Sequence, residues 1–309
     1  MWRGVEEVFR ACDIVGESLV WDDRRNALVW VDIVGRRIQR LNPATAEYEL
    51  WPMQDFVTSI GLCEDGSAIL GLRRRIALWD YLSAPVSLVT VEPDKPMNRL
   101  NEGKVGPDGA FWVGTMVDNL HDDGRPKQGA DRGGAIFRIS SDGSVAQLTE
   151  ATFGLTNTLA WTKDNRLIVA DTAANRIFSY PMNPATFDLG RRSHFAAPFD
   201  RGLPDGSCLD SQGFLWNCRV AGGACLVRFS PSGTIDRVVD LPCTWPTTCA
   251  FGGEDLSTLY VTSARFTMSA EHLSDRPQEG SLFALRPGVA GLREHRFQNL
   301  VRDADSGIL

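Results

Sequence analysis

The sequence lacks the clustered positive charge that nucleic-acid binding requires. Its 309 residues carry 32 Lys and Arg against 39 Asp and Glu, which gives a net charge of −7, and the densest basic run is Arg73–Arg75. Proteins bind phosphate backbones through basic patches, so we expect no nucleic-acid partner. No apolar stretch approaches the roughly 18 residues of a membrane span, so we expect no membrane partner either.

Cysteine is scarce, and its spacing forms no recognisable pairs. The seven cysteines include no C-x-x-C motif. An odd number in a chain of this length is typical of buried thiols in a reducing compartment and not of a disulfide framework. Met1–Glu7 places acidic residues where a secretory signal needs an apolar core. We therefore expect a cytoplasmic protein.

Several common catalytic signatures are also missing. The sequence contains no G-x-S-x-G nucleophile elbow, no H-E-x-x-H zinc motif and no G-x-x-x-x-G-K-[ST] phosphate loop. The four histidines are far apart: His121, His194, His272 and His295. These absences disfavour a serine hydrolase, a histidine-rich zinc enzyme and a nucleotide-dependent enzyme.

What the sequence does contain is an internal repeat. A short apolar strand runs into a polar turn and a second apolar strand leaves it, as in Ser18–Asp32 and Leu159–Asp171, and a third apolar segment follows, as in Arg37–Leu41. Six turns recur at steps of 42 to 56 residues and are marked by Asp23, Asp65, Asp108, Asp164, Gln212 and Glu254. This period is typical of four-stranded propeller blades.

Six such units predict an all-β fold: a six-bladed β-propeller with four-stranded blades around a central channel, formed as one domain by residues 1–309. We expect Val5–Cys12 to add a strand to the last blade and so close the ring. The third unit is the longest because it contains residues 117–133, which are rich in Asp and Gly. Two interpretations of this insertion stay open, a solvated loop and a lid over one end of the channel.

One polar residue lies near the start of the first strand of each unit. These residues are Glu17, Ser59, Asn101, Asn157, Asp205 and Thr248. In a propeller such positions surround one mouth of the central channel. Convergent carboxylate and amide oxygens are typical ligands of a hard divalent cation, and buried carboxylates without a partner are costly. The alternative for each single residue is a turn cap or a partner of channel water.

Six segments closely resemble, in order, motifs of the senescence-marker-protein (regucalcin)/gluconolactonase/luciferin-regenerating family. They are Val15–Ser18, Asn98–Lys104, Gly114–Met116, Thr156–Leu159, Leu203–Gly206 and Thr247–Gly253. The resemblance implies a six-bladed propeller with one divalent metal ion in its channel. Many members of the family hydrolyse sugar lactones.

The resemblance also implies roles for individual residues. Glu17, Asn157 and Asp205 correspond to the metal ligands of the family, and Asp205 also to its general base. Arg99 and Asn101 correspond to substrate-contacting residues, although Asn101 could instead belong to the metal site. We expect Ca²⁺, with Zn²⁺, Mg²⁺ and Mn²⁺ as alternatives.

The sequence departs from the family pattern at two positions. Asn119 stands where some members have a Glu that contacts the sugar, and we expect it to bind substrate. Thr158 stands where the family usually has Gly, which restricts the backbone near the ligand. The identity of the sugar and the shape of the metal site are therefore left open.

Together these residues predict a metal-dependent hydrolase that opens an aldonolactone to the aldonic acid. The metal would act as a Lewis acid and Asp205 as the general base, with a metal-bound hydroxide as the competing nucleophile. Two other functions stay open: an organophosphate-hydrolysing propeller and a non-enzymatic calcium-binding or interaction propeller. We expect a small-molecule sugar lactone as partner and a monomer or small homo-oligomer.

Overall fold

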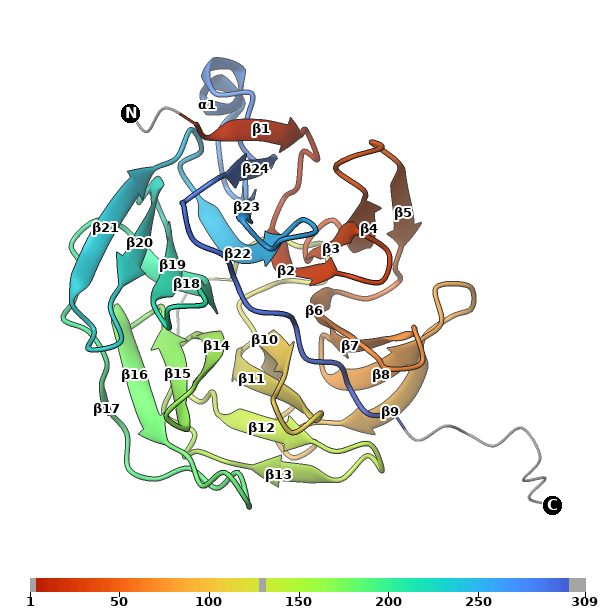
Figure 1. The fold of residues 1–309 in the computed structure, drawn as a ribbon. Helices are drawn as coiled ribbons and strands as arrows, with labels where there is room; N and C mark the ends of the chain where they lie inside the picture. The colour runs from red at the N-terminus through yellow and green to blue at the C-terminus, as the bar shows by residue number, and fades with distance from the viewer. Residues whose placement is uncertain (1–3, 128–131, 300–309) are drawn as a thin grey trace.

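The computed structural model describes residues 4–127 and 132–299. Within these residues the strands form six four-stranded antiparallel sheets, which are arranged as blades around a central axis (Figure 1). The predicted all-β, six-bladed propeller with four-stranded blades is confirmed.

The inner strand of each blade lies next to the axis and is almost entirely buried. The inner strands are β2 (Gly16–Asp22), β6 (Val57–Leu62), β10 (Asn98–Val105), β14 (Thr156–Thr162), β18 (Leu203–Leu209) and β22 (Pro246–Gly252). Each contacts the inner strand of the next blade, so that the six strands form the wall of the channel.

The second and third strands carry the blades outward. The second strands are β3 (Ala27–Asp32), β7 (Ala68–Leu72), β11 (Phe111–Val117), β15 (Arg166–Asp171), β19 (Leu215–Val220) and β23 (Thr258–Ser263). The third strands are β4 (Arg37–Leu41), β8 (Arg75–Trp79), β12 (Ile136–Ile139), β16 (Arg176–Pro181), β20 (Cys225–Phe229) and β24 (Leu282–Leu285).

The outer strands are mostly exposed. They are β5 (Tyr48–Pro52), β9 (Val86–Thr90), β13 (Val145–Gln147), β17 (Ser193–His194), β21 (Ile235–Asp240) and, in the last blade, β1 (Glu6–Phe9). Strand β1 pairs antiparallel with β24, and Glu6 lies opposite Ala284. The predicted closure of the ring by the N-terminal segment is therefore confirmed.

The apolar core lies between neighbouring blades. Ile38 of blade 1 packs in one cluster with Ile60 and Leu70 of blade 2, and Trp112 of blade 3 packs with Leu159 of blade 4. Face-to-face packing of this kind removes apolar surface from water on both sides of a sheet. It holds the six blades as one rigid wall around the channel.

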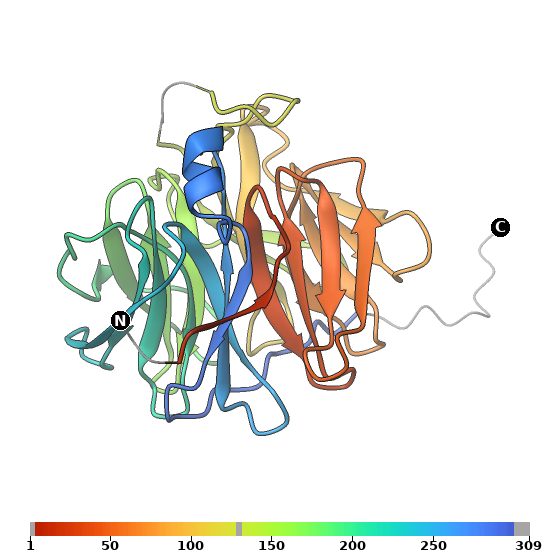
Figure 2. The ribbon, with the colours of Figure 1, turned by 90° about the horizontal axis from the view of Figure 1, so that it is seen from above.

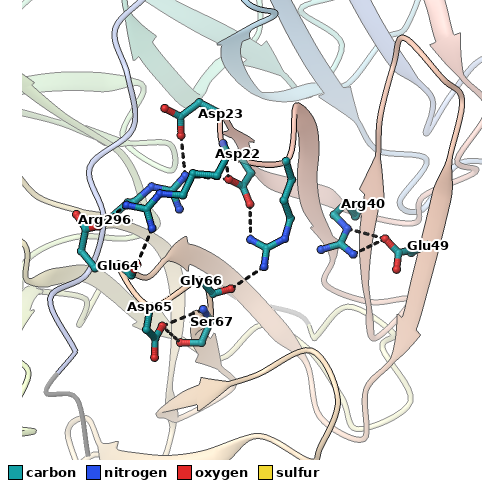
Figure 3. A network of polar contacts seen from close by, with 11 residues as sticks. Asp22, Asp23, Arg40, Glu49, Glu64, Asp65, Gly66, Ser67 and Arg296 are labelled. Carbon is teal, nitrogen blue, oxygen red and sulfur yellow. Dashed lines mark hydrogen bonds and ion pairs between the residues drawn. The ribbon is translucent and has the colours of Figure 1, made fainter.

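A C-terminal strap (residues 286–299) crosses the end of the propeller that carries the inner hairpin turns (Figure 1). Arg296 of the strap donates to Asp22 and Asp23 at 2.8 and 2.6 Å (Figure 3). Phe297 is fully buried beside blade 2. Inside this end of the channel, Glu294 of the strap pairs with Lys104 at 3.2 Å. The strap thus covers one end of the channel.

The opposite end carries the insertion of blade 3 and the short helix α1 (Ala270–Asp275), which Ser269 caps (Figure 2). None of the helices in the described ranges is long and apolar enough to cross a membrane. The strap and the insertion thus lie at opposite ends of the propeller (Figure 2).

Candidate active site

A cavity of about 280 Å³ opens where the inner strands begin. All six predicted site residues line it: Glu17, Arg99, Asn101, Asn119, Asn157 and Asp205. Ser59 and Thr248, the remaining positions of the predicted polar ring, are buried but are not among the residues that line this cavity. The structure thus brings together side chains from blades 1, 3, 4 and 5.

A β-bulge in each inner strand lies next to these residues. The pairing register shifts between Glu17 and Val20 on β2 and between Asn157 and Leu159 on β14, and the other four inner strands shift at corresponding places. A bulge redirects the side chains beside it and ends regular pairing. Strict strand alternation therefore cannot show which side chains face the channel.

The carboxylates of Glu17 and Asp205 lie in this cavity without a cationic partner. Their exposed fractions are 7% and 5%, and neither forms an ion pair with any residue that the structure describes. Glu17 accepts a hydrogen bond from the Ser18 N–H at 3.1 Å. Oδ1 of Asp205 is buried and has no hydrogen-bond partner among the described atoms. Such groups are costly unless a proton or a cation neutralises them.

The same burial alters the acidity of both groups. Burial raises the pKa of Glu17 well above its usual range, and the negative charges of Asp205 and Glu102 raise it further. Burial and then the charge of Glu102 likewise raise the pKa of Asp205. Glu102 itself, one of the motif residues, has its pKa raised to about 7 by burial. The floor of the cavity therefore attracts positive charge.

A cation in this cavity requires an amide ligand in addition to the carboxylates. In the described part of the chain, no cluster of three or more His, Cys, Asp or Glu can hold a metal ion. Glu17 and Asp205 with the amide oxygen of Asn157 form an all-oxygen donor set, which suits a hard divalent cation. The unpartnered Oδ1 of Asp205 fits this interpretation.

Thr172 fixes the orientation of the Asn157 amide. Nδ2 of Asn157 donates to Oγ1 of Thr172 at 2.8 Å, and Oδ1 of Asn157 accepts from Nδ2 of Asn101 at 3.2 Å. The Thr172 hydroxyl in turn donates to the carbonyl of Pro204, next to Asp205, at 2.6 Å. Thr172 was not predicted from the sequence, because it belongs to none of the motifs.

Arg99 and the two asparagines form a polar group on the side of blade 3. Nε and Nη2 of Arg99 donate to Oδ1 of Asn119 at 3.2 and 2.9 Å, and Nη1 donates to Oδ1 of Asn101 at 2.8 Å. Burial lowers the pKa of Arg99 to about 10, so the guanidinium keeps its charge at neutral pH. It therefore holds both asparagine side chains at the cavity.

Thr158 connects the backbone of blades 4 and 5. It adopts φ 57°, a left-handed conformation that is rare for a β-branched residue. Its hydroxyl donates to the carbonyl of Asp205 at 2.6 Å and lies 2.8 Å from Oγ of Ser207. Thr158 therefore keeps a conformation that suits Gly and adds a hydrogen bond to Asp205.

The described part of the blade 3 insertion covers one side of the cavity. Asn119 and Leu120 line the cavity, and Leu120 also packs into the apolar cluster between blades 1 and 2. Arg73 of blade 2 pairs with Asp118 and Asp122, in each case at 2.6 Å. Residues 118–120 are thus held against the cavity, whereas residues 121–123, 125 and 126 are exposed, so both interpretations of the insertion stay open. Residues 128–131 of the insertion lie outside the described ranges.

The sequence matches a known protein family over most of its length. The sequence profile of the SMP-30/Gluconolactonase/LRE-like region matches residues 15–265, most of the chain. The chain belongs to this family. The family membership inferred from the six motifs is thus confirmed.

Relatives in the SMP-30/gluconolactonase/LRE-like family match almost the whole chain. A 6-deoxy-6-sulfogluconolactonase of Pseudomonas putida is 35% identical over 94% of this chain and 97% of the relative. Regucalcin of Gallus gallus is 33% identical over 92% and 94%. The crystal structure of a calcium-binding protein, regucalcin, from Agrobacterium tumefaciens superposes with a TM-score of 0.86 at 25% identity, over 96% and 97%.

Proposed function

We propose that the protein is a metal-dependent lactonase that opens an aldonolactone to the aldonic acid. The observation that carries the proposal is the pair of buried, unpaired carboxylates, Glu17 and Asp205, beside the amide of Asn157 in an open cavity. Membership of a family that includes gluconolactonases supports the choice of reaction.

Glu17, Asn157 and Asp205 would hold one divalent cation. Ca²⁺ suits this oxygen set best, and Zn²⁺, Mg²⁺ and Mn²⁺ are the alternatives. When bound, such an ion polarises an ester carbonyl and stabilises the negative charge that develops on its oxygen.

The residues of the chain supply proton transfer and orientation. Asp205 takes a proton from water as the water oxygen forms a bond to the lactone carbonyl carbon. The bond between that carbon and the ring oxygen breaks, and Asp205 returns the proton to the ring oxygen. Arg99 holds Asn101 and Asn119 against the substrate. The new carboxylic acid then ionises and releases one proton to the solution.

The released proton allows a direct test with a pH indicator. We expect chelator-treated protein to lose lactonase activity and to regain it with Ca²⁺ or one of the alternative ions. Asp205→Asn is expected to lose at least a hundredfold in kcat. Ser59→Ala is the matched control, because Ser59 is a buried inner-strand residue outside the cavity. Full activity of the metal-free protein would refute the proposed function.

Calorimetric titration with Ca²⁺ and the same assay with phosphoesters separate the two remaining interpretations. Ca²⁺ binding without turnover of any lactone would favour a calcium-binding propeller, and faster turnover of phosphoesters than of every lactone would favour an organophosphate hydrolase.

A cytoplasmic location and a monomer or small homo-oligomer remain predictions. Size-exclusion chromatography with light scattering tests the second of these.

A further inference from the structure

The cavity has two chemically different sides. The polar side chains of Arg99, Asn101 and Asn119 all come from blade 3 and the segment that follows β11. Eleven of the nineteen lining residues are apolar. Six of them line the side formed by blades 6 and 1: Val15, Ile33, Val34, Trp245, Ala264 and Phe266. Blade 6 faces blade 3 across the ring, and the other five apolar residues come from the blade 3 insertion and from blades 4 and 5.

The wall formed by blades 6 and 1 contains three polar groups: the Glu17 carboxylate, which belongs to the proposed metal site, the indole N–H of Trp245 and the hydroxyl of Thr247. Its hydroxyl residue Thr247 already donates to the carbonyl of Gly16 and lies 2.9 Å from Oγ1 of Thr262. Among the described residues that line the cavity, Arg99 is the only cation, and it belongs to the opposite side. A hydroxyl or an anionic group directed at Phe266 and the aliphatic residues of this wall would lose its hydration without a replacement partner.

We infer that the preferred substrate is a deoxy aldonolactone, in which a methyl group replaces the terminal hydroxymethyl group. This inference rests on the proposed lactonase function and names the substrate class within it. The ring hydroxyls face Asn101 and Asn119, while the methyl group packs against Trp245 and Phe266. Apolar contact is favourable on this wall, and the missing hydroxyl avoids an unpaired polar group there.

Matched pairs of lactones test the inference on the unmodified protein with its metal. L-fuconolactone differs from L-galactonolactone, and L-rhamnonolactone from L-mannonolactone, only by the hydroxyl group at C6. We expect kcat/KM to be at least tenfold higher for the deoxy member of at least one pair. Equal or faster turnover of both hydroxymethyl lactones would overturn the inference and leave the lactonase function intact. No turnover of any of the four, with turnover of other aldonolactones, would overturn the inference alone. No turnover of any aldonolactone with Ca²⁺, Zn²⁺, Mg²⁺ or Mn²⁺ would overturn both.

Two variants locate the preference in the apolar wall. Phe266→Ser and Trp245→Ser are expected to bring the ratio of the two kcat/KM values close to one, because they slow the deoxy lactone selectively. Leu82→Ser is the control, since Leu82 is 91% exposed and outside the cavity. A ratio unchanged in both wall variants would contradict the inference.

Discussion

At the scale of single residues, the site depends on groups that the protein leaves electrostatically unsatisfied. The ion pairs Arg228–Asp210 and Arg296–Asp22 show that the chain neutralises buried carboxylates elsewhere, at 2.7 and 2.8 Å. Glu17 and Asp205 are the contrast, because the described residues provide no such cation for them. Unpaired charge of this kind is typical of functional sites and lowers stability.

Thr158 provides a first test at this scale. Thr158→Val keeps the branched shape but removes the hydroxyl that bonds to the carbonyl of Asp205, so we expect kcat to fall about tenfold, equivalent to about 1.4 kcal/mol. KM should change less than twofold, because no substrate contact is lost. Thr158→Ser retains the hydroxyl and should retain the rate. Wild-type kcat in the Val variant, or equal loss in the Ser variant, would exclude this positioning role.

The thiols provide a second test. All seven cysteines are free, and six of them are buried. Burial raises the pKa of Cys63 and of Cys218 to about 12, so little reactive thiolate forms near neutral pH. With Ellman's reagent we expect the native protein to react at one thiol, that of half-buried Cys12, and the unfolded protein at seven. Rapid reaction of several thiols in the native state would contradict this burial.

At the scale of elements, the sequence predicts the blades well because hairpins leave a periodic pattern. The third strand of the first blade has the predicted bounds, Arg37–Leu41. The exposed outer strands carry a weaker signal, since neither face of Val145–Gln147 is buried. Apolar alternation marks a strand only where one face is covered.

The site was only partly predictable for a related reason. Strand starts and family motifs identified Glu17, Asn157 and Asp205, because position in a repeat fixes position around the axis. They did not identify Thr172 or the charge that Glu102 contributes. Glu102 lies at the bulge of β10, and a one-residue irregularity of this kind leaves no mark in the hydrophobic pattern. Thr172 follows the second strand β15 and belongs to none of the motifs.

The insertion of blade 3 provides a test at the element scale. Arg73 anchors it through Asp118, Asp122 and the carbonyl of Leu120. In Arg73→Met we expect KM to rise severalfold with little change in kcat, because the insertion positions Asn119 but does not transfer protons. Arg125→Met is the matched control, since the exposed Arg125–Asp123 pair contributes little. An equal rise in both variants would argue against a covering role.

At the scale of the whole molecule, one end of the channel is covered and the other end carries the candidate site. The strap covers one end through Arg296 and Phe297, and the cavity opens at the other. Pairing of β1 with β24 joins the N-terminal segment to the last blade and so closes the ring of six blades. A rigid ring of this kind can hold unpaired carboxylates in place, because their mutual repulsion cannot separate the inner strands.

Phe297 tests the contribution of the strap to stability. Its side chain is fully buried against blade 2, so Phe297→Ala is expected to lower the free energy of unfolding by about 3–5 kcal/mol. Urea denaturation measures the change, with exposed Leu82→Ala as the control. Below the transition the variant should keep its Ca²⁺ affinity, because the site lies at the other end. A loss under 1 kcal/mol would show that the strap is not part of the cooperative fold.

The most direct test of the account is calorimetric titration of the metal-free protein with Ca²⁺. We predict one site per chain in the wild type and in Ser59→Ala. In Glu17→Gln and in Asp205→Asn the affinity should fall at least a hundredfold, with the fold preserved by circular dichroism. Unchanged affinity in these two variants, or no binding of Ca²⁺ or the alternative ions by the wild type, would contradict the proposed metal site.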